Sequence, residues 1–296
     1  MSVKVTVLSG PNALPLTNSL ASGGDRLFAF GGTDLKQTRD LKKFVLTEME
    51  LAVQAVFADG GEVWAGGTAL ARSTDGGTTF APVTLPTTVA KLMGGIGGGI
   101  HAIAREGNGS IWLGGANGLL LCGTGGKFVR VKALSKETVT RAVSTADGAV
   151  LITSNRGRVY TCAKRKATAA RLATKGPLDG IAVTPRGTVV VVGDGTPLGP
   201  GAKSRSAVAF RSDDGGRTFK LAKVPKVPPF TSLACLPDGR LVAGGRADGV
   251  FVSNDDGATF TAVSHGIKND RDFNSAVTHR GAVLLCGPGQ ALLRVE

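Results

Sequence analysis

The chain has 296 residues and a net charge of +13, with 42% hydrophobic and 19% charged residues. This composition excludes a disordered chain, because disordered chains lack enough apolar residues to form a core. No apolar run reaches the roughly 20 residues that a transmembrane helix needs, and the first ten residues contain no apolar signal segment. We therefore expect a cytoplasmic protein without a transmembrane segment.

The four cysteines agree with a cytoplasmic location. They form no C-x-x-C pair and lie within or at the end of apolar runs, which predicts buried, reduced thiols. These residues are Cys122, Cys162, Cys235 and Cys286.

Short apolar segments, separated by turns, run through the chain and predict β-strands. The first of them, residues 3–8, alternates cleanly between apolar and polar side chains. Several later segments are continuously apolar, as is typical of strands buried on both faces; examples are residues 27–30, 63–65, 111–113, 189–192 and 241–243. Only residues 34–43 have a spacing that suits a helix.

Turns between these segments recur with a regular period. Seven turns from Gly24 to Gly281 have a mean spacing near 43 residues, which is the length of one four-stranded propeller blade. We therefore predict an all-β fold with one domain, residues 1–296, forming a seven-bladed β-propeller of four-stranded antiparallel blades. The expected blades span about residues 14–50, 51–86, 98–133, 138–175, 178–226, 230–264 and 273–296, the last joined by residues 1–9.

The last expected blade has no sequence left for an outer strand. We therefore expect the N-terminal strand to pair into this blade and to close the ring. Closure would remove a sheet edge that otherwise templates aggregation.

A motif of eight residues, Ser-x-Asp-x-Gly-x-Thr-Phe, occurs three times between apolar runs. Ser and Asp side chains accept hydrogen bonds from backbone N–H groups, and Gly adopts positive φ, so the motif predicts hairpin turns. A degenerate copy at residues 124–128 lacks the Ser and the Asp. The fixed positions are Ser73, Asp75, Gly77, Thr79 and Phe80; Ser212, Asp214, Gly216, Thr218 and Phe219; and Ser253, Asp255, Gly257, Thr259 and Phe260.

This motif resembles the Asp box, or BNR repeat, of sialidase-like β-propellers. The chain resembles the photosystem-assembly-factor branch of these propellers more than the true sialidases. The resemblance implies that the motif is a structural turn between the two outer strands of a blade, away from the ligand-binding face.

The pattern of sialidase catalysis is missing from the sequence. The family uses an arginine triad and a tyrosine nucleophile, but Tyr160 is the only tyrosine and lies mid-strand in the fourth repeat. The three histidines do not cluster with cysteines or acids, which argues against a metal. Residues 97–102 match the glycine spacing of a dinucleotide fingerprint, but a strand follows instead of a helix. We therefore expect no catalytic residue, no metal and no cofactor.

Positive charge is concentrated in the middle third of the chain. Residues 127–226 contain 20 Lys and Arg against 6 Asp and Glu, whereas the rest is nearly neutral. Such a field attracts acidic protein surfaces and nucleic acids. Further basic residues occur in long connections that we place opposite the Asp boxes, such as residues 33–43, 194–206 and 264–274. The candidate partner-binding residues are Arg156, Arg158, Lys164, Arg165, Lys166, Lys203, Arg205, Lys268, Asp270, Arg271 and Asp272.

These patterns predict a non-enzymatic interaction module that binds an acidic protein surface or peptide through blades four and five and the loop-rich face. Two alternatives stay open. A carbohydrate-active or glycan-binding propeller would need exposed aromatics, whereas Trp64 and Trp112 occupy inner-strand positions typical of a core. Nonspecific nucleic-acid binding would use the same charge, although aromatics that could stack on bases are scarce there.

Overall fold

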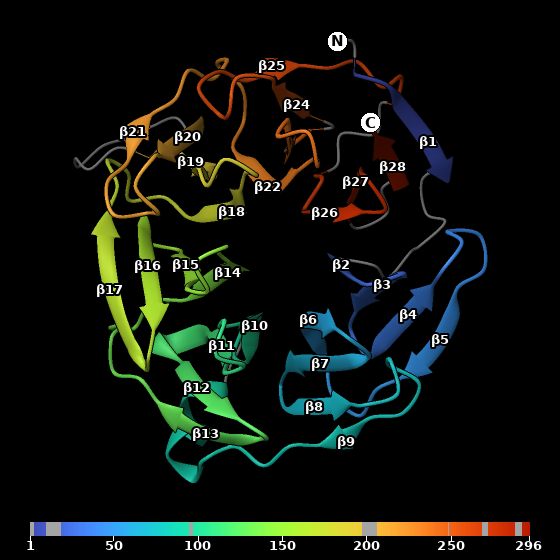
Figure 1. The fold of residues 1–296 in the computed structure, drawn as a ribbon, viewed down its shortest axis with the longest axis vertical. Helices are drawn as coiled ribbons and strands as arrows, with labels where there is room; N and C mark the ends of the chain where they lie inside the picture. Colours follow the sequence, from blue (N-terminus) through green and yellow to red (C-terminus); the bar gives the residue numbers. More distant parts are fainter. Residues whose placement is uncertain are drawn as a thin grey trace.

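The structure, a computed structural model, describes residues 3–9, 19–94, 97–196, 206–247, 249–267, 272–287 and 292–296. Its described strands form seven four-stranded antiparallel sheets, which are arranged as blades around one axis (Figure 1). The predicted seven-bladed β-propeller is therefore confirmed.

Each of the first six blades uses four successive strands, ordered from the axis outward. Blades one and two are β2 (Ser19–Gly23), β3 (Arg26–Gly31), β4 (Asp34–Thr38) and β5 (Val45–Glu48), then β6 (Val53–Asp59), β7 (Glu62–Gly67), β8 (Leu70–Ser73) and β9 (Ala81–Pro82). Blades three and four are β10 (Ile100–Arg105), β11 (Ile111–Gly115), β12 (Leu120–Thr124) and β13 (Lys127–Arg130), then β14 (Val139–Ser144), β15 (Val150–Ser154), β16 (Arg158–Ala163) and β17 (Lys166–Arg171).

The later blades continue the pattern. Blades five and six are β18 (Leu178–Val183), β19 (Val189–Asp194), β20 (Ala207–Ser212) and β21 (Lys220–Leu221), then β22 (Phe230–Cys235), β23 (Leu241–Gly245), β24 (Val250–Ser253) and β25 (Thr261–Ala262). Blade seven contains β26 (Ser275–His279), β27 (Ala282–Cys286), β28 (Leu292–Val295) and β1 (Val5–Ser9). Three short helices complete the described elements: η1 (Thr87–Val89), α1 (Ala90–Met93) and η2 (Ala116–Gly118).

The two ends of the chain meet in blade seven. Strand β1 pairs antiparallel with β28, with Val5 opposite Val295 and Val7 opposite Leu293. Figure 1 shows β1 on the outside of this blade, beside β28. The N-terminal strand therefore supplies the outer strand that the C-terminal segment lacks, as predicted.

The hydrophobic core lies between neighbouring blades. Trp64 packs between blades two and three, and Trp112 packs between blades three and four; each side chain is 1% exposed. The predicted core role of both tryptophans is confirmed. All four cysteines are free of disulfides; Cys235 is half-buried and the other three are buried.

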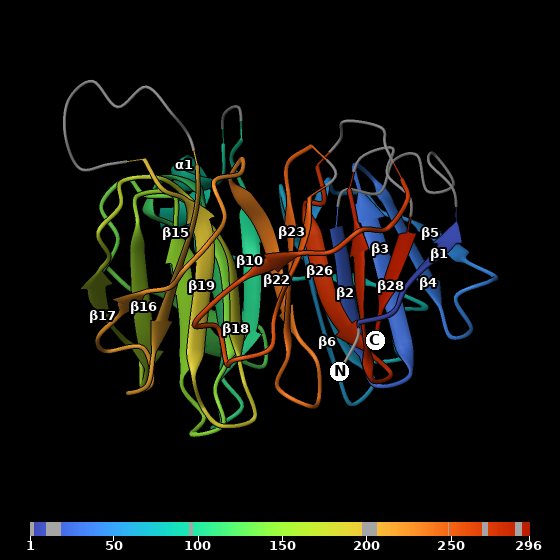
Figure 2. The same cartoon turned by 90° about the horizontal axis from the view of Figure 1, so that it is seen from above.

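The propeller has two faces with different connections. Because strands within a blade alternate in direction, the turns after the first and third strands lie at one end of the ring. We call this end the Asp-box face, because the three motif copies follow third strands. The opposite end, the loop face, carries the turns after second strands and the connections between blades, including α1 (Figure 2).

Residues 34–43, the one segment whose spacing suits a helix, do not form one. Asp34–Thr38 forms strand β4, which pairs with β3 and with β5. This sheet pairing outweighs the local spacing, because both edges of the segment find backbone partners. The turn after β4 lies on the Asp-box face, so its basic residues are not on the loop face where we expected them.

Within the described residues, no helix combines the length and apolar character that crossing a bilayer requires.

Candidate functional site

The polar residues of the Asp-box motif bond to one another inside each turn. Ser73 Oγ accepts a hydrogen bond from the backbone N–H of Gly77 at 2.8 Å and donates to Asp75 Oδ1 at 2.7 Å. Asp75 also accepts from the hydroxyl of Thr79 at 2.7 Å. These contacts, with the Thr79 backbone N–H bond first among them, lower the pKa of Asp75 far below its ordinary value.

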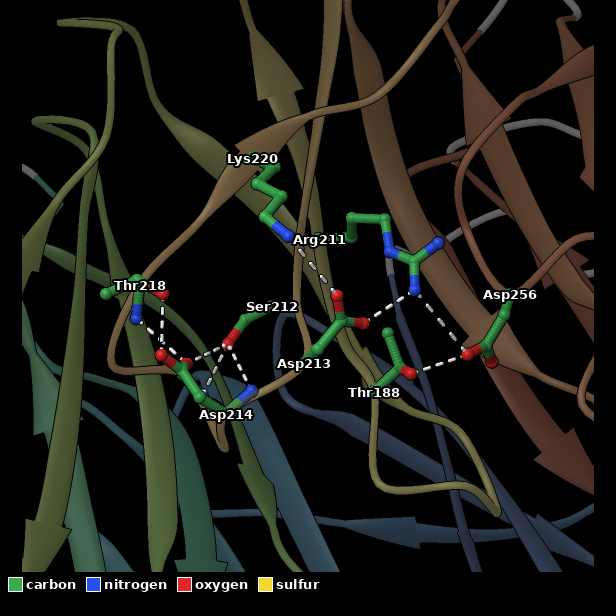
Figure 3. A network of polar contacts seen from close by, with 9 residues as sticks. Thr188, Arg211, Ser212, Asp213, Asp214, Thr218, Lys220 and Asp256 are labelled. Atoms are coloured by element: carbon green, nitrogen blue, oxygen red, sulfur yellow. Dashed lines mark hydrogen bonds and ion pairs between the residues drawn. The ribbon is translucent and has the colours of Figure 1, made fainter.

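The motif copies of blades five and six also connect these blades to each other (Figure 3). Asp256 accepts a hydrogen bond from Thr188 of blade five at 2.5 Å, and it lies 4.0 Å from the guanidinium of Arg211. Arg211 also pairs with Asp213 at 2.6 Å. Arg211 is therefore neutralised within the fold, although it belongs to the basic stretch of the sequence.

Blade one contains a related turn that the sequence analysis missed. Thr38 donates to Asp40 Oδ1 at 3.0 Å, and Asp40 accepts from the backbone N–H groups of Lys42 and Lys43, both at 2.9 Å. The backbone bonds from Lys43 and Lys42 lower the pKa of Asp40 to about 2. The sequence contains a trace of this turn, because Thr38 and Asp40 have the spacing of the motif's Ser and Asp and are followed by Phe44. The segment is one residue shorter than the motif, so the pattern does not match it.

The structure divides the candidate partner-binding residues into separate groups. Asp272 pairs with Arg246 at 3.8 Å and accepts from the backbone N–H of Ala247, so it is engaged within the fold. Arg156 and Arg158 lie at the loop-face end of β16, whereas residues 164–166 lie at the opposite end, on the Asp-box face. Five other candidates lie outside the described residues: Lys203, Arg205, Lys268, Asp270 and Arg271.

A basic cleft of about 490 Å³ lies at the loop-face end of blade four. The register of β16 and β17 places Arg158 directly opposite Arg171. Arg156 in the preceding turn and Lys175 in the following connection complete the set of cations. We call this region the basic cleft; its lining residues are Arg156, Gly157, Arg158, Arg171, Leu172, Thr174 and Lys175.

A buried carboxylate holds Arg158 in position. Arg158 pairs with Glu137, whose side chain is fully buried, and Glu137 also accepts a hydrogen bond from the Tyr160 hydroxyl at 2.9 Å. The hydrogen bond to Tyr160, together with the charge of Glu137, raises the pKa of Arg158. Burial raises the pKa of Tyr160 as well, and its side chain is 2% exposed. This tyrosine and glutamate thus position an arginine and do not face solvent.

The other cations of the cleft have no counter-charge within the part of the chain that the structure describes. Among the described residues, Glu137 is the only acid that pairs with any of them, which leaves Arg156, Arg171 and Lys175 uncompensated. All three are exposed. Like charges directly opposite across two strands destabilise a sheet, and Glu137 offsets this repulsion only on the Arg158 side.

Gly157 brings the two sides of the cleft together. It has φ of +65°, and a Cβ at this position would lie 2.2 Å from the carbonyl oxygen of Thr174. Its own carbonyl accepts a hydrogen bond from the backbone N–H of Leu172 at 3.2 Å. Thr174 in turn donates to the Asp194 carbonyl of blade five at 2.8 Å. Only glycine allows this close approach of the turn and the connection.

No protein-family model and no curated protein sequence matches this chain. Solved structures are similar to it over nearly their whole length. A streptogramin B lyase has a TM-score of 0.77 at 13% identity, covering 99% of this chain and 97% of the lyase chain. A structure of YCF48 bound to a D1 peptide has a TM-score of 0.70 at 17% identity, with 99% and 96% covered.

A third similar structure is the WD40 β-propeller domain of Doa1. Its TM-score is 0.70 at 12% identity, and the match covers 98% of this chain and 96% of that chain. The streptogramin B lyase and YCF48 are seven-bladed propellers. At such low identities these similarities show the fold alone.

Proposed function

We propose that this protein is a non-enzymatic interaction module that docks an acidic segment of a partner protein on the basic cleft of blade four. The observation that carries the proposal is the imbalance of charge: four cations line the cleft, and one buried carboxylate opposes them. Arginine guanidiniums bind carboxylates through paired N–H donors, so aspartate and glutamate side chains suit this surface.

Relatives of the fold support a protein partner. One similar structure is YCF48 in complex with a peptide, and another is a WD40 propeller domain. The cleft also opens on the loop face, where connections between strands vary most freely in propellers. Neither neighbour identifies the partner of this chain, so the acidic character follows from the cleft itself.

An acidic protein suits the cleft better than nucleic acid or a glycan. Single-stranded nucleic acids and sugars are typically held by exposed aromatic rings. Tyr160, the aromatic residue below the cleft, is buried, and the apolar lining comes from Leu172 and the arginine stems. Residues 164–166, which would extend a tract for a long polyanion, lie at the other end of β16.

Fluorescence anisotropy with a labelled peptide of alternating glutamate and serine tests the proposal. We compare the wild type with the double variant Arg156→Glu/Arg171→Glu. The matched control is Lys42→Glu/Lys43→Glu, which changes the net charge equally on blade one, where both side chains are exposed. We expect the cleft variant to lose at least about tenfold in affinity, or about 1.4 kcal/mol, and the control to lose little.

A single-stranded DNA oligonucleotide of the same charge serves as the competing probe. Equal losses in the two charge-reversed variants would mean that the overall field attracts the peptide, and would overturn the cleft as the site. Tighter binding of the DNA, with an affinity that falls steeply with salt, would favour the nucleic-acid alternative instead. Preference for the peptide over the DNA, with an affinity that falls as salt screens the cations of the cleft, supports the proposal.

A further inference from the structure

Strand β17 is the longest outer strand among the described blades. It has six residues, whereas the outer strands of the other blades have two to five. All six residues pair with β16 in one register without a bulge. Figure 1 shows β17 on the outside of blade four, and no described strand lies beyond it. One edge of β17 is therefore open.

The register decides which backbone groups of β17 point to this open edge. Alternate residues of an antiparallel strand direct their N–H and C=O groups to opposite sides. The Leu172 N–H donates to the Gly157 carbonyl, on the side of β16, so every second residue counted back from Leu172 also turns toward β16. The groups of Ala167, Ala169 and Arg171 point outward, and no described residue forms a hydrogen bond with them.

The open edge lacks the features that usually prevent an edge strand from pairing with another chain. Such features are a proline, a bulge or a charge within the strand. Residues 167–170, the middle of β17, are uncharged, include no proline and pair regularly with β16. Their outward backbone groups could therefore hold a strand from another chain, which is the binding mode called strand addition.

Unpaired cations lie at both ends of the open edge. At the loop-face end, Arg171 adjoins the other cations of the basic cleft. At the Asp-box end, the cations of residues 164–166 are exposed, and no described acid lies within ion-pair distance of any of them. Five residue steps separate Lys166 from Arg171, which is roughly 17 Å along an antiparallel strand.

The turn at the Asp-box end holds its cations in a costly conformation. Lys164 and Arg165 have φ of +50° and +62°, a region that favours glycine. Glu106 of blade three is buried and accepts hydrogen bonds from the Lys164 backbone N–H at 2.8 Å and from Trp112 Nε1 at 2.9 Å. Asn-Gly would fit this turn at lower cost, so two cations at these positions indicate a use for their charge.

The charges also decide which kind of partner suits the edge. Antiparallel pairing with β17 of a second copy would bring Lys166 opposite Arg171, and like charges across two strands destabilise a sheet. A nucleic acid carries charge along its whole length and has no backbone that pairs with a strand. A peptide strand with acidic ends and an uncharged middle matches both the cations and the open hydrogen-bonding groups.

We propose that an acidic segment of a partner protein binds as an added strand along the outer edge of β17. One acidic end of this segment lies in the basic cleft and the other lies at residues 164–166. The inference rests on the proposed function, because it uses the same cleft, and it adds the conformation of the bound segment and a second anchor.

Backbone methylation of a peptide tests strand addition without changing any charge. The probe is the labelled peptide Glu-Glu-Thr-Val-Thr-Val-Glu-Glu, and its derivative carries N-methyl groups on the four central amides. Fluorescence anisotropy with the full chain measures both affinities. Because the derivative cannot donate hydrogen bonds to β17, we expect it to bind at least about tenfold more weakly. Equal affinity of the two peptides would overturn strand addition.

A proline substitution tests the edge from the side of the protein. Ala169→Pro removes one outward N–H, keeps the hydrogen bonds to β16 and leaves the charge unchanged. Leu46→Pro is the matched control on β5 of blade one, because the Met49 N–H bond to Thr33 fixes a register in which the N–H of the exposed Leu46 also points outward. We expect at least about tenfold weaker binding of the probe by Ala169→Pro and wild-type binding by Leu46→Pro. Circular dichroism melts show that both variants are folded, and wild-type binding by Ala169→Pro would overturn the proposal.

Lys164→Asn/Arg165→Gly tests the second anchor in a variant whose new residues suit the turn. A second peptide, in which serine replaces one of the two glutamate pairs, has a single acidic end. We expect the wild type to bind the two-ended probe at least about fivefold more tightly than this peptide, and the variant to lose that preference. An unchanged preference in the variant would overturn the second anchor.

The outcomes separate strand addition from the proposed function. Loss of the probe in Arg156→Glu/Arg171→Glu, without any effect of N-methylation or of Ala169→Pro, would overturn strand addition and leave the cleft as the binding site. Wild-type affinity of the charge-reversed variant for the probe would overturn the proposed function itself. A dimer in analytical ultracentrifugation that Ala169→Pro dissociates would assign the edge to a second copy of the chain and would also overturn the inference.

Discussion

Replacing Gly157 by alanine should destabilise the protein much more than the same change at Gly215. Both residues have positive φ, +65° and +73°, and alanine pays about 1 kcal/mol or more in this region. A Cβ at Gly215 would meet no atom within 4 Å, whereas at Gly157 it would lie 2.2 Å from the Thr174 carbonyl oxygen. Relieving that clash requires the connection after β17 to move.

This movement would strain two hydrogen bonds, from Leu172 to Gly157 and from Thr174 to Asp194. With roughly 0.5–1.5 kcal/mol for each bond, roughly 1–3 kcal/mol for overpacking and about 1 kcal/mol for positive φ, we expect Gly157→Ala to cost about 5 kcal/mol. We expect about 1 kcal/mol for Gly215→Ala. Scanning calorimetry of the two variants and the wild type measures the difference.

Gly157→Ala should also weaken binding of the acidic peptide, because Arg156 and Arg158 would shift relative to Arg171. Gly215→Ala should leave that binding unchanged. Equal unfolding midpoints for the two variants would refute the claim that the turn and the connection are held together by this close approach.

Three further predictions concern the ring and its turns. Deleting residues 1–8 removes nearly all of β1 and exposes the edge of β28, so the yield of soluble protein should fall sharply. A truncated protein with an unchanged melting temperature would contradict closure of the ring by β1. Lys164 and Arg165 both have positive φ in a two-residue hairpin turn. Because Asn and Gly adopt positive φ more easily, Lys164→Asn/Arg165→Gly should raise the free energy of unfolding by about 1 kcal/mol. Calorimetry measures this change, and an unchanged or lower unfolding midpoint would argue against strain in the turn. The hydrogen bonds that lower the pKa values of Asp75 and Asp214 stabilise the fold above the ordinary Asp pKa, near 4, and are lost as pH falls further. The melting temperature should therefore drop below about pH 4, less steeply in Asp75→Asn/Asp214→Asn; parallel pH profiles would refute this contribution.

The architecture could be predicted because the repeats carry it redundantly. Seven inner turns and continuous apolar strands indicate the blades even where one motif copy is degenerate, as at residues 124–128. The sequence pattern did not reveal the turn at Thr38 and Asp40, because the pattern has a fixed length. The same hydrogen bonds form in a turn that is one residue shorter. The helical spacing of residues 34–43 does not produce a helix, because sheet pairing with other segments decides the conformation of such a short segment.

The cleft and the open edge of β17 were harder to predict because both depend on strand register. Arg158 meets Arg171 only because Lys164 and Arg165 form a two-residue turn, and this pair of residues is unusual for such a turn. Grouping Arg156 with residues 164–166 therefore joined side chains from opposite ends of one strand. The same register directs the backbone groups of Ala169 to the open edge, and no local feature of the sequence marks this.

Exchange of charges between the protein and its ligand tests the central claim most directly. The variant Arg156→Glu/Arg171→Glu is titrated with a peptide in which lysine replaces every glutamate of the acidic probe. If the cleft recognises an acidic segment by its uncompensated cations, the reversed pair should regain affinity, and the wild type should not bind the lysine peptide. Absence of binding by the reversed pair, or equal binding of the lysine peptide to the wild type, would contradict the account.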